Sequence, residues 1–155
     1  MAKKWNRNAA KLALKLDGII VNHFLNPLGN RLNKAIHDGL DSGKDIQGKS
    51  FEPLSEITIN KKAHDQILFD SGKLKDSIKK DPAKLARPTF KIFVEGPAKK
   101  YGAKHNEGFV NESGKEVAKR EWFGIPKSFK PSGDEHKKAA NETRLRLLTT
   151  WRKGK

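Results

Sequence analysis

The sequence contains no cysteine in its 155 residues, which excludes disulfide bonds and thiolate metal sites. It also lacks a long apolar run, and a membrane-spanning helix needs about 20 apolar residues. Its N-terminal apolar stretch, Leu12–Leu16, is interrupted by Lys15 and followed at once by Asp17. A secretory signal would need an uninterrupted apolar segment there. We therefore expect a protein that is soluble and not exported.

Acidic residues are scarce relative to basic ones. The chain carries 18 acidic and 33 basic residues, which gives a formal net charge of +15. The excess is spread over both halves of the sequence, without a basic tail. Such a charge attracts polyanions such as DNA through counterion release. It is equally compatible with a solvated surface that binds no nucleic acid, and the composition leaves both interpretations open.

The length favours one domain over residues 1–155. Because only 35% of the residues are apolar, we expect a modest core that neighbouring copies of the chain could complete. We divide the domain into a helical N-terminal part (1–42), a core with a small sheet (43–131) and a C-terminal helix (132–155). The predicted fold class is α+β, with a small antiparallel sheet flanked by long N-terminal and C-terminal helices.

Apolar residues at three- and four-residue steps predict the helices. The first covers residues 3–25 and ends at Pro27 and Gly29; a second covers 31–40. Ser132 is expected to cap the last helix. The predicted inward face of this helix is formed by His136, Ala140, Thr143, Leu147 and Trp151.

The middle of the chain predicts shorter elements. Asp70 or Ser71 would cap a short helix that runs through Ile78. Residues 89–94 alternate as a half-buried strand does, with Phe90, Ile92 and Val94 on one side. The segment Tyr101–Gly108 is expected to be a second strand or an extended loop, and residues 109–118 a mobile hairpin tip.

One segment fits a nucleotide-binding pattern letter for letter. Gly43–Ser50 matches the phosphate-loop expression G-x-x-x-x-G-K-S, which works only between a buried strand and a helix. The residues before it are polar and helical, and Pro53 follows it closely. We interpret the segment as a glycine turn before an apolar anchor, Phe51.

No other catalytic or metal-binding pattern stands out. The histidines lack the spacing of metal ligands, and no pair of acids suggests hydrolytic chemistry. We predict neither an enzyme nor a bound cofactor or metal. The five histidines of the chain are His23, His37, His64, His105 and His136.

Four short motifs are the most informative feature of the chain. Each combines glycine, a small polar residue and one or two large apolar side chains, which is the composition of turns anchored in a core. In chain order they are Gly48–Ser55, Leu68–Ile78, Tyr101–Gly108 and Arg120–Pro126.

The order and spacing of these motifs resemble the phage virion-morphogenesis family, tail-completion proteins that act at the head–tail junction of tailed bacteriophages. The resemblance runs from about Gly48 to Pro126. Ser71 stands where the family has threonine, and the usual proline before Arg120 is missing. The matching positions are Gly48, Phe51, Pro53, Leu54, Asp70, Gly72, Leu74, Ser77, Ile78, Tyr101, His105, Gly108, Arg120, Trp122, Phe123 and Gly124.

This resemblance implies a structural role in the virion. Copies of the chain would form a ring, a hexamer by resemblance, at the head–tail junction after assembly in the host cytoplasm. They would contact other neck and tail proteins, and they would contact the genomic DNA without reading its sequence. They would not contact a membrane. His105 would have a structural role, and of Trp122 and Phe123 one would lie in the core and the other at a contact surface.

The alternative is a small basic nucleic-acid-binding protein. In that case Trp5, Trp122 and the arginines would contact nucleic acid directly, since aromatic rings stack on bases and arginines bind phosphates.

Overall fold

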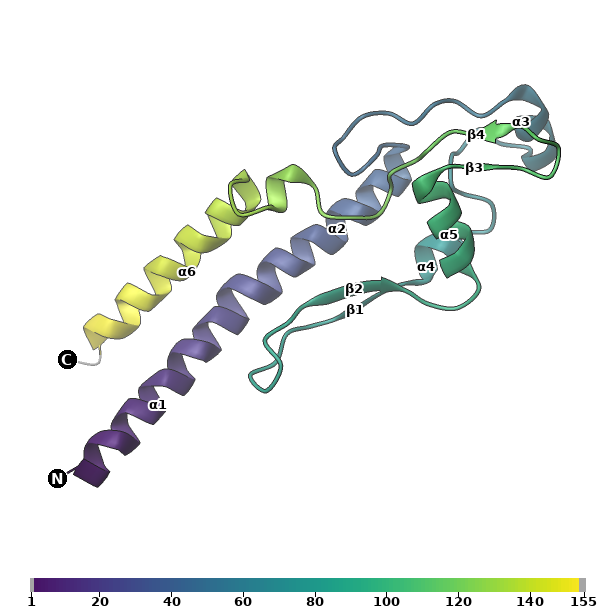
Figure 1. Cartoon of the computed structure of the whole chain (residues 1–155). Helices are drawn as coiled ribbons and strands as arrows, with labels where there is room; N and C mark the ends of the chain where they lie inside the picture. Colours follow the sequence, from purple (N-terminus) through teal and green to yellow (C-terminus); the bar gives the residue numbers. More distant parts are fainter. Residues whose placement is uncertain (1, 154–155) are drawn as a thin grey trace. The chain divides into compact units, whose positions relative to one another are not determined.

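The computed structural model describes residues 2–153, and the side chains of residues 10–150 and 152. It confirms the α+β class, because long helices lie near both ends of the chain and two small antiparallel sheets between them (Figure 1). The side chains of Trp5 and Trp151 lie outside the described residues, so their expected roles stay predictions.

The chain divides into two compact units, which are described separately. The first unit combines the chain up to Arg31, the segment Asp81–Lys91 and the chain from Lys127 onward. The second unit combines Leu32–Lys80 and Ile92–Pro126. That the whole chain folds as one domain stays a prediction.

The N-terminal helices follow one another without a break, so the predicted stop at Pro27 and Gly29 is wrong. They are α1 (Ala2–Ile20), the π-helix η1 (Val21–Leu25) and α2 (Asn26–Ser42).

Pro27 is tolerated because its missing hydrogen bond is replaced. Proline has no backbone N–H, so the carbonyl of His23 four residues earlier loses its helical donor. The hydroxyl of Thr143 donates to that carbonyl at 3.0 Å. The wider π-turn lies directly before the proline, and the Asn26 N–H donates to the carbonyl of Val21.

Gly29 marks a close approach between segments and not a helix end. A Cβ atom at Gly29 would lie 2.3 Å from Cγ of Phe90, so only glycine fits under this ring. Nearby, the side-chain amide of Asn26 forms two hydrogen bonds with the backbone of Ala83, at 2.8 and 3.1 Å. These contacts hold residues 81–91 against the helix.

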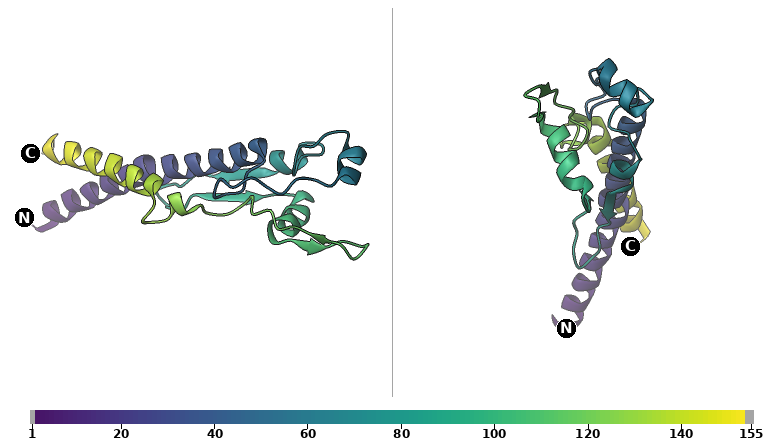
Figure 2. Two further views of the ribbon diagram at one scale, coloured as in Figure 1. Left: turned by 90° about the horizontal axis from the view of Figure 1, so that it is seen from above. Right: turned by 90° about the vertical axis from the view of Figure 1, so that its right-hand side faces the viewer.

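The C-terminal helix α6 (Asp134–Lys153) follows the 3₁₀-helix η2 (Lys127–Phe129) and lies alongside α1 and η1 (Figures 1 and 2). Ser132 does not cap it, because Gly133 precedes the helix and its carbonyl accepts the Lys137 N–H at 3.0 Å.

The inward face of α6 differs by one position from the prediction. Thr143 is buried as expected, but Ala139 is fully buried while Ala140 is exposed. Thr143 also donates to the Ala139 carbonyl at 2.8 Å, one turn earlier. His136 contacts the Phe24 ring edge-on, with ring centroids 5.1 Å apart. Three-residue and four-residue steps both occur on a helix, so periodicity alone does not distinguish the two alanines.

The second unit has its own apolar core. Its buried members come from α2, from the segments after it and from Trp122: Ile36, Leu40, Phe51, Leu68, Leu74, Ile78 and Trp122. Strands β1 (Ile78–Asp81) and β2 (Lys91–Val94) form a two-stranded sheet. Ile92 and Val94 pack against the core and Phe93 is exposed, which confirms the predicted alternation.

Short elements complete this unit. The helices are α3 (Glu56–Lys62), α4 (Lys73–Asp76) and α5 (Ala98–Glu107). Strand β3 (Phe109–Val110) pairs antiparallel with β4 (Glu116–Val117), which confirms the hairpin. None of the helices in the described part of the chain combines the length and the apolar character needed to cross a membrane.

Two predictions fail here. The helix expected from Asp70 or Ser71 is the single turn α4; Gly72 precedes it with a left-handed φ of 74°, and no side chain caps it. It ends before Ile78, which begins β1. The segment expected to be a strand or an extended loop, Tyr101–Gly108, is helical up to Glu107.

Candidate functional site

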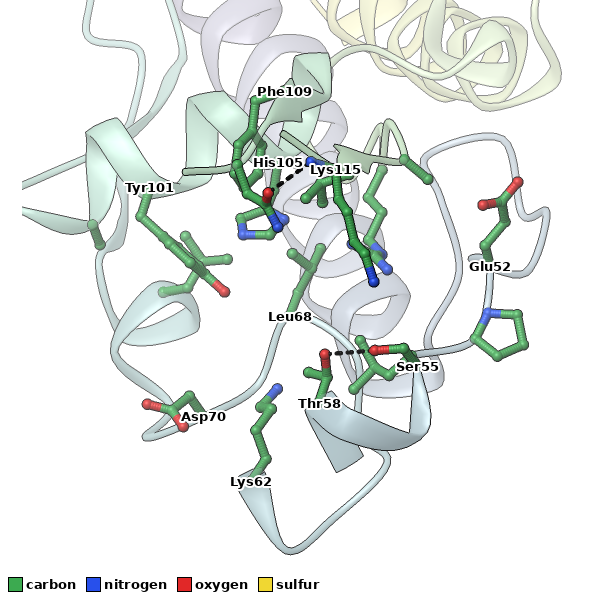
Figure 3. A pocket seen from close by; sticks show the side chains of 18 of the residues that line it. Glu52, Ser55, Thr58, Lys62, Leu68, Asp70, Tyr101, His105, Phe109 and Lys115 are labelled. Atoms are coloured by element: carbon green, nitrogen blue, oxygen red, sulfur yellow. Dashed lines mark hydrogen bonds between the residues drawn. The ribbon is translucent and has the colours of Figure 1, made fainter. Parts of the chain in front are cut away.

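The four sequence motifs surround one pocket of about 800 Å³ in the second unit. The pocket is lined by residues of every motif and by the β3–β4 hairpin (Figure 3). The motif residues on its wall are Glu52, Pro53, Leu54, Ser55, Leu68, Asp70, Ser71, Gly72, Lys73, Leu74, Tyr101, His105 and Arg120. The structure therefore brings together positions that are up to 68 residues apart in the chain, from Glu52 to Arg120.

The first motif begins in a closed turn. The segment Gly43–Ser50 is held by an antiparallel bridge between Lys44 and Ser50. One carboxylate oxygen of Asp45 accepts the N–H groups of Gln47 and Lys49 at 2.8 and 2.9 Å.

This geometry confirms that the segment is a turn and not a phosphate loop. A phosphate loop needs free backbone amides between a strand and a helix, whereas here Asp45 already occupies two of them. The helix α2 precedes the turn, and α3 does not begin until Glu56. Beyond the turn, Phe51 enters the core while Pro53 and Leu54 reach the pocket.

The second motif anchors the floor of the pocket. Leu68 and Leu74 are buried and face it, and Ile78 lies in the core beneath. Leu68 has a left-handed φ of 56°, which is unusual for a large side chain. The hydroxyl of Ser77 donates to the Leu74 carbonyl at 2.6 Å and closes the turn before β1.

Three hydrogen bonds join the third motif to the fourth. The N–H of Arg120 donates to the His105 carbonyl at 2.8 Å. The indole Nε1–H of Trp122 donates to the Gly102 carbonyl at 2.9 Å. The third bond links the Phe123 N–H to Oδ1 of Asn106, also at 2.9 Å. Helix α5 is therefore fixed along its length to the segment that carries Arg120.

Glycines make these close approaches possible. A Cβ at Gly102 would lie 2.7 Å from Cζ2 of Trp122, and one at Gly124 would lie 2.9 Å from Cδ1 of Ile46. Gly108 ends α5 with φ 79°. These contacts explain why α5 is a helix although its sequence suggested a strand: the glycine in Tyr-Gly-Ala-Lys-His allows the indole to pack on the helix backbone.

An aromatic row lies on one side of α5. The ring centroids of Tyr101 and His105 are 4.4 Å apart, and the Phe109 ring is edge-on to His105 at 5.2 Å. All three side chains line the pocket (Figure 3). His105 lies in a helix and not in the strand or extended loop expected for its segment, and its structural role stays a prediction.

Charged side chains of both signs line the pocket: Lys62, Lys73, Lys115 and Arg120 with Glu52, Asp70 and Glu116. Burial first, and then the neighbouring cations Arg120 and Lys62, together lower the pKa of His105 to about 4. Burial lowers the pKa of Lys62; Asp70 acts in the opposite direction and raises it, and Arg120 makes a smaller lowering contribution. For Tyr101, burial and then Asp70 raise the pKa. The imidazole of His105 is therefore neutral at neutral pH.

Trp122 and Phe123 occupy different environments. Trp122 is only 2% exposed and belongs to the core, so the hypothesis that it stacks on nucleic-acid bases is wrong. Phe123 is half-buried and packs against the same core. A contact role for Phe123 stays a prediction.

Sequence reasoning missed Lys62 and Lys115, which lie outside the four motifs. Figure 3 shows that their side chains extend toward the pocket from different elements, Lys62 from α3 and Lys115 from the turn before β4. No sequence signal distinguishes them from the many other lysines of the chain. The described residues include no group of three or more histidine and carboxylate side chains placed to hold a metal ion.

Comparison with known proteins identifies one family. The model of the phage virion morphogenesis family matches residues 4–132, which include all four motifs and the whole pocket. No curated protein and no solved structure matches the chain significantly.

Proposed function

Because the chain belongs to the phage virion morphogenesis family, we propose that it completes the tail or joins it to the head of a tailed bacteriophage. The family match carries this proposal, since it makes the chain a phage structural or assembly protein. Copies would form a ring or collar around the DNA channel at the head–tail junction, and a hexamer is the stoichiometry we favour.

Exposed apolar side chains in the first unit support assembly into an oligomer. Leu14 on α1 and Leu145 on α6 are 61% and 60% exposed. An apolar groove of about 360 Å³, lined by Leu12, Leu16 and Leu148 among others, lies along the same two helices. Exposed apolar side chains and apolar grooves are typical of protein–protein contacts.

The small core supports the same proposal. Among the described residues no large side chain is completely buried, and Ala139 alone reaches 0% exposure. Part of the apolar surface therefore stays available for contacts between subunits of a ring. The positive charge of the chain suits a ring whose channel faces the phosphates of the genome.

Electron microscopy of phage lacking this gene tests the proposal. A junction role predicts full heads lying apart from complete tails, and the chain supplied from a plasmid should restore joined particles. Joined, intact particles in the absence of the gene would contradict it.

Direct nucleic-acid binding is the second candidate function, and the net charge of +15 favours it. The burial of Trp122 removes one of its proposed base contacts. Strong affinity of the isolated monomer for DNA, falling steeply with salt concentration, would favour this candidate over a collar protein.

A further inference from the structure

We propose that the pocket surrounded by the four motifs is a docking site for an acidic segment of a partner protein, with a carboxylate that pairs with Arg120 and Lys62. The inference rests on the proposed function for its setting, since it describes a contact made during virion assembly. The charge, burial and shape of the pocket support the docking site without reference to the junction role.

The first observation is that Arg120 is a buried cation without an ionic partner among the described residues. It is only 7% exposed, lines the pocket, and its Nε atom has no hydrogen-bond acceptor. The ion pairs among the described side chains do not include it. A guanidinium stays charged in proteins, and an unpaired buried charge is strongly unfavourable. An incoming carboxylate would supply the missing partner.

A second cation faces the same space. Lys62 is half-buried and lines the pocket, and its ammonium donates to the Gln66 carbonyl at 3.2 Å. His105 also lines the pocket, and its buried Nδ1 has no hydrogen-bond partner among the described residues, so the imidazole can bind an occupant too. The acids on the pocket wall, Asp70, Glu52 and Glu116, are exposed and form no ion pair with Arg120.

Apolar side chains form another part of the wall, which favours a peptide over nucleic acid. Leu54, Ile57, Leu68, Phe109 and Val117 line the pocket beside the cations. Ile57 is 62% exposed and so presents apolar area to an occupant. A duplex carries its phosphates on a rigid outer surface and cannot enter such a pocket, whereas an acidic side chain flanked by apolar residues can.

The partner is expected to be a different protein. The net charge of +15 and the cations Arg120 and Lys62 in the pocket attract an acidic segment of another protein more strongly than a basic surface of a further copy of this chain. Charge complementarity thus selects an acidic partner subunit as the occupant.

Selection from a displayed random peptide library on the full-length chain tests this docking site. We expect the recovered peptides to be rich in aspartate or glutamate next to apolar residues. The affinity of a selected peptide should fall about tenfold or more with Lys62→Gln, and equally when its acid is replaced by the amide. Lys49→Gln is the matched control, because Lys49 is exposed and outside the pocket; it should leave the affinity unchanged.

Two further readouts keep the test decisive. In nuclear magnetic resonance spectra, binding of the peptide should shift the imidazole resonances of His105. An oligothymidylate of about 12 nucleotides should not displace the bound peptide. Recovered peptides without acid enrichment, equal affinity of wild type and Lys62→Gln, or displacement by the oligonucleotide would overturn the proposal. Circular dichroism of Lys62→Gln verifies its fold, and Arg120→Gln is added only if it too remains folded.

Complementation separates this inference from the proposed function. If the junction role holds and the docking site exists, Lys62→Gln should restore far fewer infectious particles to the deletion phage than Lys49→Gln does. Full complementation by Lys62→Gln would overturn the docking site alone. Joined particles in the uncomplemented deletion would instead overturn the junction role.

Discussion

At the scale of single residues, the pKa of His105 depends on the burial and the charges around it in the pocket. Its imidazole lies between the Tyr101 and Phe109 rings, and its Nδ1 atom is buried without a hydrogen-bond partner. Burial first, then Arg120 and Lys62, lower its pKa. The titration of His105 therefore measures the burial and charge of its surroundings, which the sequence motif does not show.

The lowered pKa predicts a pH dependence of stability. Between the ordinary value of 6.5 and about 4, the unfolded chain binds a proton that the folded chain does not. The contribution of His105 to stability is therefore complete above pH 6.5 and is lost progressively as the pH falls toward 4. Urea unfolding at pH 7 and pH 5 should show a larger loss of unfolding free energy for wild type than for His105→Gln.

Nuclear magnetic resonance titration provides the direct check of this prediction. The His105 imidazole should titrate near pH 4, and its pKa should rise in Lys62→Gln because one neighbouring cation is removed. Titration near pH 6.5 in the wild type would contradict the assigned environment.

Gly102 is the second residue with a defined test. An added methyl group would lie 2.7 Å from Cζ2 of Trp122 and 3.0 Å from Cδ1 of Leu74. Although alanine favours a helix more than glycine does, overpacking costs about 1–3 kcal/mol. Gly102→Ala should therefore lower the unfolding free energy measured in urea. The double variant with Trp122→Phe should lose less than the sum of the two single changes, because the smaller ring leaves room; strict additivity would contradict the contact.

At the scale of elements, Gly18 and Gly29 can be compared, because both lie in the N-terminal helices but only Gly29 is in close contact with another segment. Gly29 lies under the Phe90 ring, where a Cβ would be 2.3 Å from Cγ, whereas a Cβ at Gly18 would have Cδ2 of Leu85 as its nearest neighbour, at 4.0 Å. Gly18→Ala should raise stability by up to about 1 kcal/mol through helix propensity. Gly29→Ala should lower it by about 1–3 kcal/mol through overpacking.

Thermal unfolding of both variants measures the difference. A stabilising effect of Gly29→Ala would show that residues 81–91 do not pack on the helix as described. A destabilising effect of Gly18→Ala would show that the sequence near Gly18 is not a regular helix.

Elements with strong local signals could be predicted from the sequence. The long helices near both ends, the alternation at residues 91–94 and the hairpin after Gly108 are all confirmed. The predictions that were wrong concerned elements whose structure depends on tertiary contacts. Nothing local shows that the Thr143 hydroxyl replaces the bond lost at Pro27, or that Trp122 packs on Gly102 and so stabilises helix α5.

The pocket was predictable only in part for the same reason. The motifs identified most of its anchors, because glycine and large apolar residues mark turns packed on a core. Lys62 and Lys115 belong to no motif, and their position depends on how α3 and the β3–β4 hairpin fold. The burial of Arg120 is likewise a tertiary property that its sequence neighbours do not show.

At the scale of the whole molecule, the exposed apolar residues predict assembly. Leu14→Glu and Leu145→Glu should each weaken the oligomer, since they place a charge on the apolar helix surfaces. Both side chains are exposed, so secondary structure should not change. Asn141→Glu is the control, because it adds the same charge at an exposed polar position of α6.

Sedimentation measures the outcome against the 17.4 kDa mass of one chain. The wild type and Asn141→Glu should sediment as a species near six chain masses at high protein concentration, and the leucine variants as smaller species. Identical sedimentation of all four proteins would place the subunit contacts elsewhere on the surface.

The most direct test of a junction role is cryo-electron microscopy of the intact virion, with a reconstruction of the region where head meets tail. Our account predicts a ring of density between the two that fits copies of this chain, with the pocket of each copy occupied by a segment of a neighbouring protein. Density for the chain located elsewhere in the particle, or its absence from purified virions, would contradict the account.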